Sequence, residues 1–447
     1  MSCQNDRPMR ILVADWVPSL NKGEMAILLG MLRTFDVLGE VEVSAFSFYP
    51  QFDKERYPKN VRIIDAASDL CIGTALPDKS TLFVILASLF AMLQHIFFGM
   101  MYTLIGDKAL RIMNKMIWRE YCRSDVIIIC HDEVSCIYGP RLLRFSPAYV
   151  TTLAKTLGKP VVIYANGFTK FEHAITKIGL WNILARYVLS NADLITVREE
   201  ESYRNLKDIS VNNTRIYLTA DPAFLLSPVS YNKVKSILLA ENINKSNSLL
   251  IGMTQTREIL LSVRQGNPRE IYKKGVEQMA RLVDHLIAKL DATIVFLPHC
   301  IEPYRQGNGD DRTVAKEVYD LITNKHKVVI ITKEYSAEEL KGLIGIFDLF
   351  IGGRVHSVIN ALSMGVPSIT LTRSNDERVR GIIGKTLKQE EWICNIEGLN
   401  SEILLSKIMA LLPLREEIRK NLAVRMCITK EKALLNGKLL KALLDSR

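Results

Sequence analysis

RILVADW (residues 10–16) begins the pattern that decides the fold. This short apolar run carries Asp15 near its end, the turn-rich VPSLNKG follows it, and a helical pattern then runs from Glu24 to Phe35. A strand, a loop and a helix in this order are typical of the start of a Rossmann-like domain. The sequence therefore predicts an α/β fold from its first strand onward.

Further apolar runs continue this pattern in two series. The first series comprises residues 41–48, 61–65, 125–130, 160–166, 193–198 and 215–220, and the second comprises 248–254, 292–299, 327–332, 349–353 and 367–372. Helical segments separate most of these runs, and one of them opens with Ser336 and Glu339 at capping-box spacing. Near-continuous apolar strands that alternate with helices indicate a parallel sheet covered on both faces.

A polar stretch rich in Asn and Ser separates the two series. It follows Asp221-Pro222 and extends through SPVSYNKVKS to ENINKSNS. We place the domain boundary there, with an N-terminal Rossmann-like domain over residues 1–228 and a C-terminal one over 229–447. Two domains also suit a chain of 447 residues, which is longer than one hydrophobic core usually holds.

The composition limits the kinds of partner. Lys and Arg number 58 against 48 Asp and Glu, and the resulting net charge of +10 favours phosphates, acidic sugars or anionic lipid. We expect no nucleic acid partner, because there is no zinc knuckle, Arg-rich arm or basic stretch interleaved with aromatic residues. Eight scattered cysteines without a CxxC pair indicate a reducing compartment, and MSCQNDRPMR at the start has no apolar signal region. We therefore expect a cytoplasmic protein.

One segment departs from the α/β pattern. Residues 82–105 form a stretch of 24 positions without a formal charge, which is long enough to cross a bilayer. A single crossing would, however, put strands of one expected sheet on opposite sides of the membrane. We therefore expect an apolar helical insertion over about residues 80–121, with a buried helical pair, a re-entrant hairpin and an interfacial helix as open alternatives.

Basic residues follow this apolar stretch. Lys108, Arg111, Lys115 and Arg119 are three to four positions apart, so they are expected to share one helical face that suits anionic headgroups. The simpler interpretation is a core helix beside a solvated basic face. Because 24 such residues exceed what a crossover helix needs, we favour peripheral attachment to the inner face of the cell membrane.

GGRVHS (residues 352–357) is the most informative stretch for chemistry. A strand is expected to end at the two glycines, where Arg354 and His356 meet the start of a helix. Ligands of open α/β sheets bind at the carboxyl ends of strands, and N–H groups at a helix N-terminus bind anions. Arg354 can bind a phosphate or carboxylate with two parallel bonds, and His356 can transfer a proton near neutral pH. In the competing interpretation, both side chains lie at the surface and the two glycines serve only tight packing.

The order of motifs resembles that of the polysaccharide pyruvyl transferase family. The R-x-H stretch, its helix, the small-x-G-x-P turn and the apolar strand after it look like the family's C-terminal signature. Further stretches are similar in order and spacing, namely NKGEMAIL (21–28), TVREEESYRNL (196–206), TADPAFLL (219–226) and FLPHC (296–300) with Asp310-Asp311. The similarity covers nearly the whole chain.

The resemblance implies a fold akin to that of the GT-B glycosyltransferases and phosphoenolpyruvate as donor substrate. The implied reaction moves a pyruvyl group onto a pair of sugar hydroxyls, as a ketal, on a polysaccharide or a lipid-linked saccharide precursor. None of its steps needs a metal or a further cofactor, and the sequence shows no metal-ligand spacing such as HExxH.

The implied donor suggests roles for individual residues. Its carboxylate and phosphate require at least two cationic groups, for which we choose Arg354 and Arg198. His356 best fits the group that gives and takes protons. His299, at the end of its own strand, is the reserve for that role, and it fits a strand-end histidine that holds a loop equally well.

Four weaker candidates complete the predicted site. Asn21 and Gly23 would let a ligand approach the backbone at the first helix, or form only a turn and an N-cap. Gly353 is a further candidate for substrate binding, and Arg378 would reach the phosphate of the donor or remain at the surface.

The chain also departs from the family pattern. Glu24 replaces the usual Asp, and His131-Asp132-Glu133 replaces a Gly-rich turn that bears on acceptor binding by the first domain. Arg373 or Ser374, together with Arg378, stand where the family has Tyr and Lys, and Arg need not reproduce the geometry of Lys.

Two other functions are compatible with this plan. A nucleotide-sugar glycosyltransferase would be expected to have an acidic residue near the far end of the helix after Gly353, and none occurs between Arg354 and Thr372. A non-catalytic membrane-associated scaffold fits the altered turn at residues 131–133. The two candidate arginines and His356 favour an enzyme over that scaffold.

Overall fold

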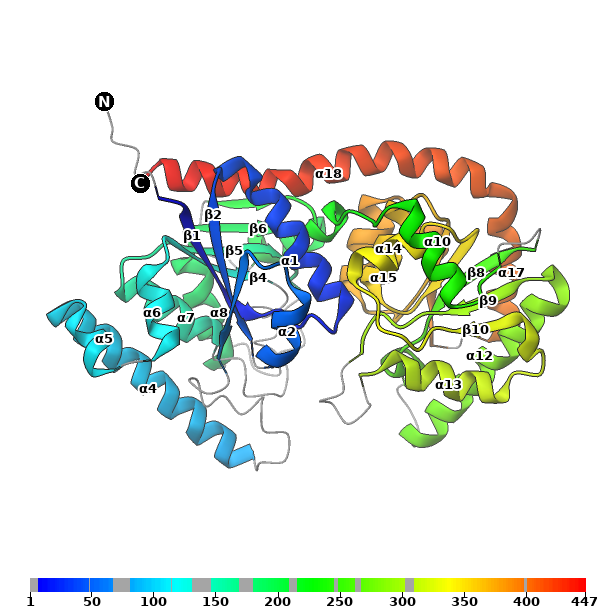
Figure 1. The fold of residues 1–447 in the computed structure, drawn as a ribbon, viewed down its shortest axis with the longest axis horizontal. Helices are drawn as coiled ribbons and strands as arrows, with labels where there is room; N and C mark the ends of the chain where they lie inside the picture. Colours follow the sequence, from blue (N-terminus) through cyan, green and yellow to red (C-terminus); the bar gives the residue numbers. More distant parts are fainter. Residues whose placement is uncertain are drawn as a thin grey trace. The chain divides into compact units, whose positions relative to one another are not determined.

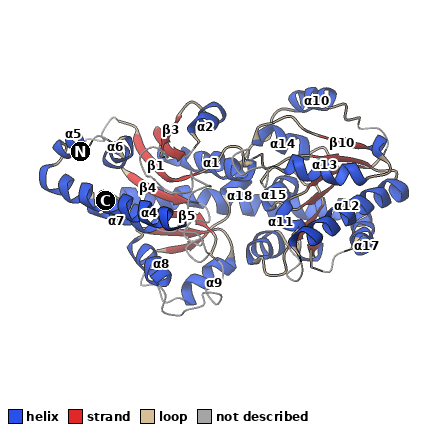
Figure 2. Cartoon of the chain, turned by 90° about the horizontal axis from the view of Figure 1, so that it is seen from below, coloured by secondary structure: helices blue, strands red, loops and turns tan. Residues whose placement is uncertain are grey.

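Two parallel β-sheets organise the protein, each in its own compact unit (Figure 1). Our structure is a computed structural model. It describes residues 7–47, 49–66, 81–113, 115–130, 146–168, 180–208, 215–244, 248–261, 267–301, 309–397 and 400–447. Helices accompany the strands of both sheets, as Figure 2 shows by colour.

The first unit contains a sheet with the strand order β3-β2-β1-β4-β5-β6-β7. Its strands are β1 (Met9–Trp16), β2 (Val41–Ser47), β3 (Val61–Asp65), β4 (Val126–Cys130), β5 (Val161–Asn166), β6 (Leu194–Val197) and β7 (Ile216–Leu218). All neighbouring strands are parallel. Every residue of β4 and β5 is buried, which explains why these strands read as unbroken apolar runs.

The second unit repeats this order with β10-β9-β8-β11-β12-β13, again all parallel. Its strands are β8 (Leu250–Thr254), β9 (Thr293–Phe296), β10 (Val328–Ile330), β11 (Leu349–Gly352), β12 (Ser368–Thr372) and β13 (Ile393–Asn395). In both sheets the order reverses between the first and fourth strands, as in a Rossmann fold. The predicted fold class, α/β with two Rossmann-like domains, is confirmed.

Helices lie between successive strands of the two sheets and also follow the last strand. Those before the second sheet are α1 (Lys22–Thr34), α2 (Pro50–Arg56), α4 (Thr81–Ile105), α5 (Lys108–Ile112), α6 (Met116–Arg123), α7 (Ser146–Thr156), α8 (Leu180–Asn191), α9 (Glu200–Asp208) and α10 (Tyr231–Ala240). Those that follow are α11 (Arg257–Leu260), α12 (Pro268–Leu290), α13 (Asp311–Leu321), α14 (Ala337–Ile344), α15 (Val355–Ser363), α16 (Glu377–Val379), α17 (Ser401–Leu411) and α18 (Arg415–Asp445). The predicted capping box opens α14, where Ser336 and Glu339 bond each other's backbone N–H.

The two units exchange segments at the ends of the chain. The first comprises Met1–Ser19, Met31–Asp221 and Lys432–Arg447, and the second comprises Leu20–Gly30 and Pro222–Glu431. The start of α1 therefore belongs with the C-terminal sheet, and the end of α18 with the N-terminal one. The boundary predicted near residue 228 is a single one and does not describe this exchange of segments.

The segment predicted as an apolar insertion forms α4, α5 and α6, between β3 and β4. Among the helices that the structure describes, none combines the length and apolarity needed to cross a membrane. The expectation that four basic residues share one helical face is wrong. Lys108 and Arg111 lie on α5, Lys115 has extended backbone, and Arg119 lies on α6, because Lys115 turns inward to bond Gln94 and to lie over Trp118.

The end of α18 is built closely into the first unit. Asn436 donates a hydrogen bond to the carbonyl of Ala220 (3.0 Å) and accepts one from Thr219 (2.9 Å), although it is fully buried. One residue on, Gly437 meets the end of α1 so closely that a Cβ atom there would overlap the carbonyl oxygen of Thr34. Both contacts fix the last turns of α18 to the first unit.

We predict that Gly437→Ala destabilises the first unit by about 1–3 kcal/mol, because backbone atoms of Thr34 must move to admit the methyl group. Thermal unfolding followed by circular dichroism would measure the change. Lys438→Ala, at the neighbouring exposed position, is the control and should shift stability by less than about 0.5 kcal/mol. Equal melting of Gly437→Ala and wild type would show that the helix does not need this close approach.

Candidate functional site

The candidate site lies at the carboxyl edge of the second sheet. His299 follows β9, and Arg354 and His356 follow β11, which neighbours β8 where the strand order reverses. Gly353 joins these strand ends, since its N–H donates to the carbonyl of Thr254 at the end of β8 (3.1 Å). Ligands of open α/β sheets bind at this position in the fold.

The start of α1 belongs to the same site, although it is about 280 residues away in sequence. Asn21 forms an antiparallel bridge with Cys300, and the N–H of Lys22 donates to the carbonyl of His299 (2.9 Å). The Asn21 side chain accepts from the N–H of Gly23 (3.1 Å) and so caps α1. The loop predicted to receive a ligand is thus held against the loop after β9.

Gly23 lies directly against the imidazole ring of His356. A Cβ atom on Gly23 would be 2.6 Å from Nδ1 of His356 and 2.8 Å from its Cβ and Cγ. The ring can therefore occupy its position only because residue 23 has no side chain. His356 itself is 9% exposed and lies in the first turn of α15.

Asp311 joins the parts of this site. One of its carboxylate oxygens accepts from Nη2 and Nε of Arg354 (2.8 and 3.2 Å), and the other accepts from the N–H groups of His299 and Cys300 (3.0 and 2.9 Å). The preceding Asp310 has a different role, because it caps α13 and pairs with Arg312 (2.6 Å). Of the acidic pair seen in the sequence, Asp311 alone bonds Arg354.

Burial and charge determine the protonation states. Burial would lower the pKa of Arg354, but Asp311 outweighs it and raises the pKa, so the guanidinium is charged. Burial also raises the pKa of Asp311, against the opposing effects of Arg354 and of the two backbone N–H groups. Burial lowers the pKa of His299 well below its usual value, and His356, Arg354 and Lys22 lower it further.

His299 is consequently a neutral histidine at neutral pH. It is fully buried, and its Nε2 lies 3.3 Å from the side-chain amide of Asn360 on α15. Its backbone bonds both Lys22 and Asp311. These contacts are compatible with a strand-end histidine that holds a loop, one of the two interpretations given for His299.

Lys22 was not among the predicted site residues. Its side chain is 1% exposed and its Nζ lies 2.8 Å from the carboxylate of Glu334. The signal was present in the sequence, because Lys22 lies between the two candidates Asn21 and Gly23. A lysine in a polar turn is usually a surface residue, and only the tertiary structure shows that this one is buried.

The other predicted residues lie elsewhere. Arg198 belongs to the first unit, where it follows β6, is 2% exposed and donates to Asp221 (3.1 Å). Arg378 lies on α16 with a side chain that is 34% exposed and 3.8 Å from Asp376. Residues 131–133, where the sequence departs from the family pattern, lie outside the described residues. Within the part of the chain that is described, no three His, Cys, Asp or Glu residues are grouped to hold a metal ion.

Comparison with known proteins identifies the family. The sequence profile of the polysaccharide pyruvyl transferases matches residues 21–375, from the Asn21 loop to beyond β12. The chain belongs to the polysaccharide pyruvyl transferase family. The resemblance seen in the sequence is thereby confirmed.

A curated relative and several solved structures are also similar to this pyruvyl transferase family member. The amylovoran biosynthesis protein AmsJ of Erwinia amylovora is 24% identical over 289 residues, which cover 64% of this chain and 65% of that relative. The UDP-GlcNAc 2-epimerase of Neisseria meningitidis has a TM-score of 0.57 at 13% identity over 97% of this chain and 100% of its own. Anabaena HepE, solved with UDP and glucose, has a TM-score of 0.54 at 10% identity over 98% and 100%. These structures show a shared fold of the GT-B type.

We predict that Asp311→Asn destabilises the second unit by about 3–5 kcal/mol, because it leaves the buried guanidinium of Arg354 without its counter-charge. Chemical denaturation would measure the loss. The double variant Asp311→Asn/Arg354→Met should recover part of it, since it removes both charges. Asp310→Asn, which keeps the helix cap and removes only the charge that pairs with the partly exposed Arg312, is the matched control and should cost less than about 1 kcal/mol. A similar loss in both single variants would argue against the central place of Asp311.

We also predict a pH dependence that belongs to His299. The unfolded chain protonates this residue near pH 6.5 and the folded protein does not, so the free energy of unfolding falls as the pH falls below about 6.5. Between pH 6.5 and 5.5, His299→Gln should lose about 1 kcal/mol less than wild type. Denaturation at both pH values tests this, and parallel losses in the two proteins would contradict it. Burial also lowers the pKa of His95, to about 3. Because His95 is present in both wild type and His299→Gln, its contribution cancels when the two losses of stability are compared.

Proposed function

We propose that this protein is a phosphoenolpyruvate-dependent pyruvyl transferase that forms a ketal on a hydroxyl pair of a polysaccharide or its saccharide precursor. One observation carries the proposal. In a member of this family, a charged arginine fixed by Asp311 lies two residues from His356, at the edge of the sheet where ligands bind. We propose no cofactor beyond the donor substrate.

The donor needs partners for a carboxylate and a phosphate. Arg354 bonds Asp311 through Nε and Nη2 and not through Nη1, and its side chain is 18% exposed. It is also the residue immediately before α15, whose first N–H groups favour an anion. For the second cation we keep Arg198 and add Lys22, which lies on the same unit as Arg354.

The proposed chemistry gives His356 one proton-transfer role. It would protonate the methylene carbon of phosphoenolpyruvate, which becomes a methyl group, while one sugar hydroxyl adds to the neighbouring carbon. The bond from that carbon to the phosphate oxygen then breaks, phosphate leaves, and the second hydroxyl closes the ketal. The two hydroxyl protons balance the one taken up by carbon and the one that leaves with phosphate.

We further propose that the enzyme works in the cytoplasm at the inner face of the cell membrane. The five cysteines that the structure describes, Cys122, Cys130, Cys300, Cys394 and Cys427, are free thiols, which suits a reducing compartment. An acceptor held on a lipid carrier would be met at that surface.

The test is calorimetric titration with phosphoenolpyruvate and with nucleotide sugars, together with phosphate release in the presence of a saccharide acceptor. We expect Arg354→Gln to weaken phosphoenolpyruvate binding at least about tenfold, because a charged hydrogen bond is lost. His356→Asn should still bind the donor but turn over about 10²–10⁴-fold more slowly. Arg312→Gln, which removes the neighbouring arginine that pairs with Asp310, is the matched control and should behave as wild type.

Other outcomes would replace the proposal. Binding of nucleotide sugars without phosphoenolpyruvate would indicate a glycosyltransferase of the same fold. Binding of neither, in a protein whose circular dichroism is unchanged, would favour the non-catalytic scaffold. Arg198→Gln and Lys22→Gln, tested in the same way, would show which of them supplies the second cation.

A further inference from the structure

Helix α4 exposes a continuous apolar stripe, which we name the outer face of α4. It consists of Phe90, Leu93, Phe97, Met100 and Leu104, whose exposed fractions lie between 55% and 77%. Large apolar side chains are often exposed singly, but five neighbours on one helix face are unusual for a protein surface that contacts only water. The stripe therefore points to a partner.

The opposite side of α4 is fixed to the first unit. Phe98 stacks on Trp118 of α6 with ring centroids 4.4 Å apart, and the indole N–H of Trp118 donates to Nδ1 of His95 (2.6 Å). His95 also stacks on Tyr149 of α7. Burial lowers the pKa of His95 to about 3, so the ring stays neutral in this apolar setting.

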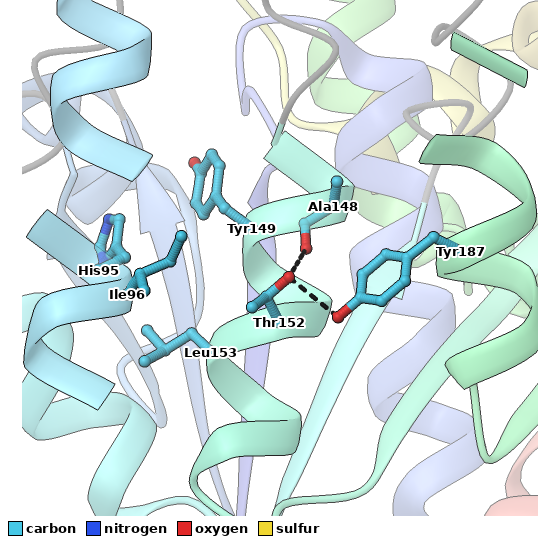
Figure 3. A pocket seen from close by; sticks show the side chains of 7 residues that line it. All are labelled: His95, Ile96, Ala148, Tyr149, Thr152, Leu153 and Tyr187. Atoms are coloured by element: carbon cyan, nitrogen blue, oxygen red, sulfur yellow. Dashed lines mark hydrogen bonds between the residues drawn. The ribbon is translucent and has the colours of Figure 1, made fainter. Parts of the chain in front are cut away.

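Figure 3 shows this inward side from close by. His95 and Ile96 of α4 lie beside Tyr149, Thr152 and Leu153 of α7, and these residues line a small cavity together with Tyr187 of α8. Gly99 lies against Thr156 at the end of α7, so the helices approach closely here. With its inner side engaged in this way, α4 cannot rotate to bury the outer face.

The outer face has the geometry of an interfacial helix. At 100° per residue its five side chains fall within a sector of about 80°, centred opposite the sector of His95, Phe98 and Gly99. At 1.5 Å per residue they extend over about 21 Å. A helix held along one side and apolar along the other can lie flat in a membrane interface.

Positive charge at one end of the outer face of α4 indicates what kind of partner it contacts. Lys108 and Arg111 on α5 and Arg119 on α6 are exposed, and Ile112 (67%) and Met116 (48%) are exposed beside them. Between residues 81 and 119 the only acidic residue is Asp107. A second copy of this chain that packed through the same face would bring basic residues against basic residues, whereas anionic lipid complements both the stripe and its basic end.

We propose that the outer face of α4 inserts into the interface of an anionic membrane, with Lys108 and Arg111 at the headgroups. This inference rests on the membrane location proposed above and is independent of the donor chemistry. It assigns the contact to the outer face of α4 and to the two basic residues of α5.

The experiment is cosedimentation of the full chain with vesicles of phosphatidylcholine alone or mixed equally with phosphatidylglycerol. Wild type should bind the anionic vesicles, and added salt should weaken binding. Leu93→Ser/Phe97→Ser/Leu104→Ser and Lys108→Glu/Arg111→Glu should each lose at least about tenfold in affinity. The matched controls are Leu239→Ser/Val424→Ser and Lys420→Glu/Lys432→Glu, which change exposed residues elsewhere and should bind as wild type.

Two results would overturn the inference. One is vesicle binding by the triple serine variant that equals that of wild type. The other is a wild-type dimer in light scattering that the triple variant converts to a monomer while no protein binds vesicles, which would show that a second copy covers the face. Phosphate release with a soluble acceptor, measured on the same variants, separates the two proposals. Its absence in wild type would remove the pyruvyl-transfer proposal and leave the membrane contact unaffected.

Discussion

The candidate site depends on the hydrogen bonds that the buried carboxylate of Asp311 accepts. This carboxylate holds the backbone after β9 with two N–H bonds and the guanidinium after β11 with two more, so a single buried group sets the distance between two strand ends. The loop before α1 is attached to the same backbone through His299 and Cys300. The arrangement also fixes the position of the Arg354 side chain without the help of a ligand.

The sequence could predict what is repeated or local. Both Rossmann-like sheets were visible in apolar runs, because buried parallel strands leave little room for polar residues. The turn from β11 into α15 could also be predicted from the sequence, because glycines, Arg354 and His356 occur together there. The membership of the family followed from the order of such local motifs.

The tertiary partners could not be predicted in the same way. Asp310 and Asp311 look alike in sequence, and only the packing of α13 directs one outward to a cap and the other inward to Arg354. From the sequence, Lys22 is expected to be an exposed turn residue. In the structure it is buried next to the bridge between Asn21 and Cys300. The basic segment after α4 was predicted as one helix face, but extended backbone at Lys115 divides it. Each of these outcomes depends on residues far away in the chain.

The fold alone does not select the donor. Proteins at 8–15% identity, among them enzymes solved with UDP-GlcNAc or with UDP and glucose, share the two-unit plan. Function has to be argued from the side chains of the site and not from the fold. In this protein those side chains are an arginine already paired with an aspartate and a histidine that packs on a glycine backbone.

The exchange of segments between the units bears on how the chain is made. The first unit takes residues 432–447, which a ribosome synthesises after the whole of the second unit. Until they emerge, Thr219 and the carbonyl of Ala220 lack their buried partner Asn436, and the end of α1 lacks the helix that packs on it. The N-terminal unit therefore cannot make these contacts until the second unit has been synthesised, although nearly all of its own residues are translated first.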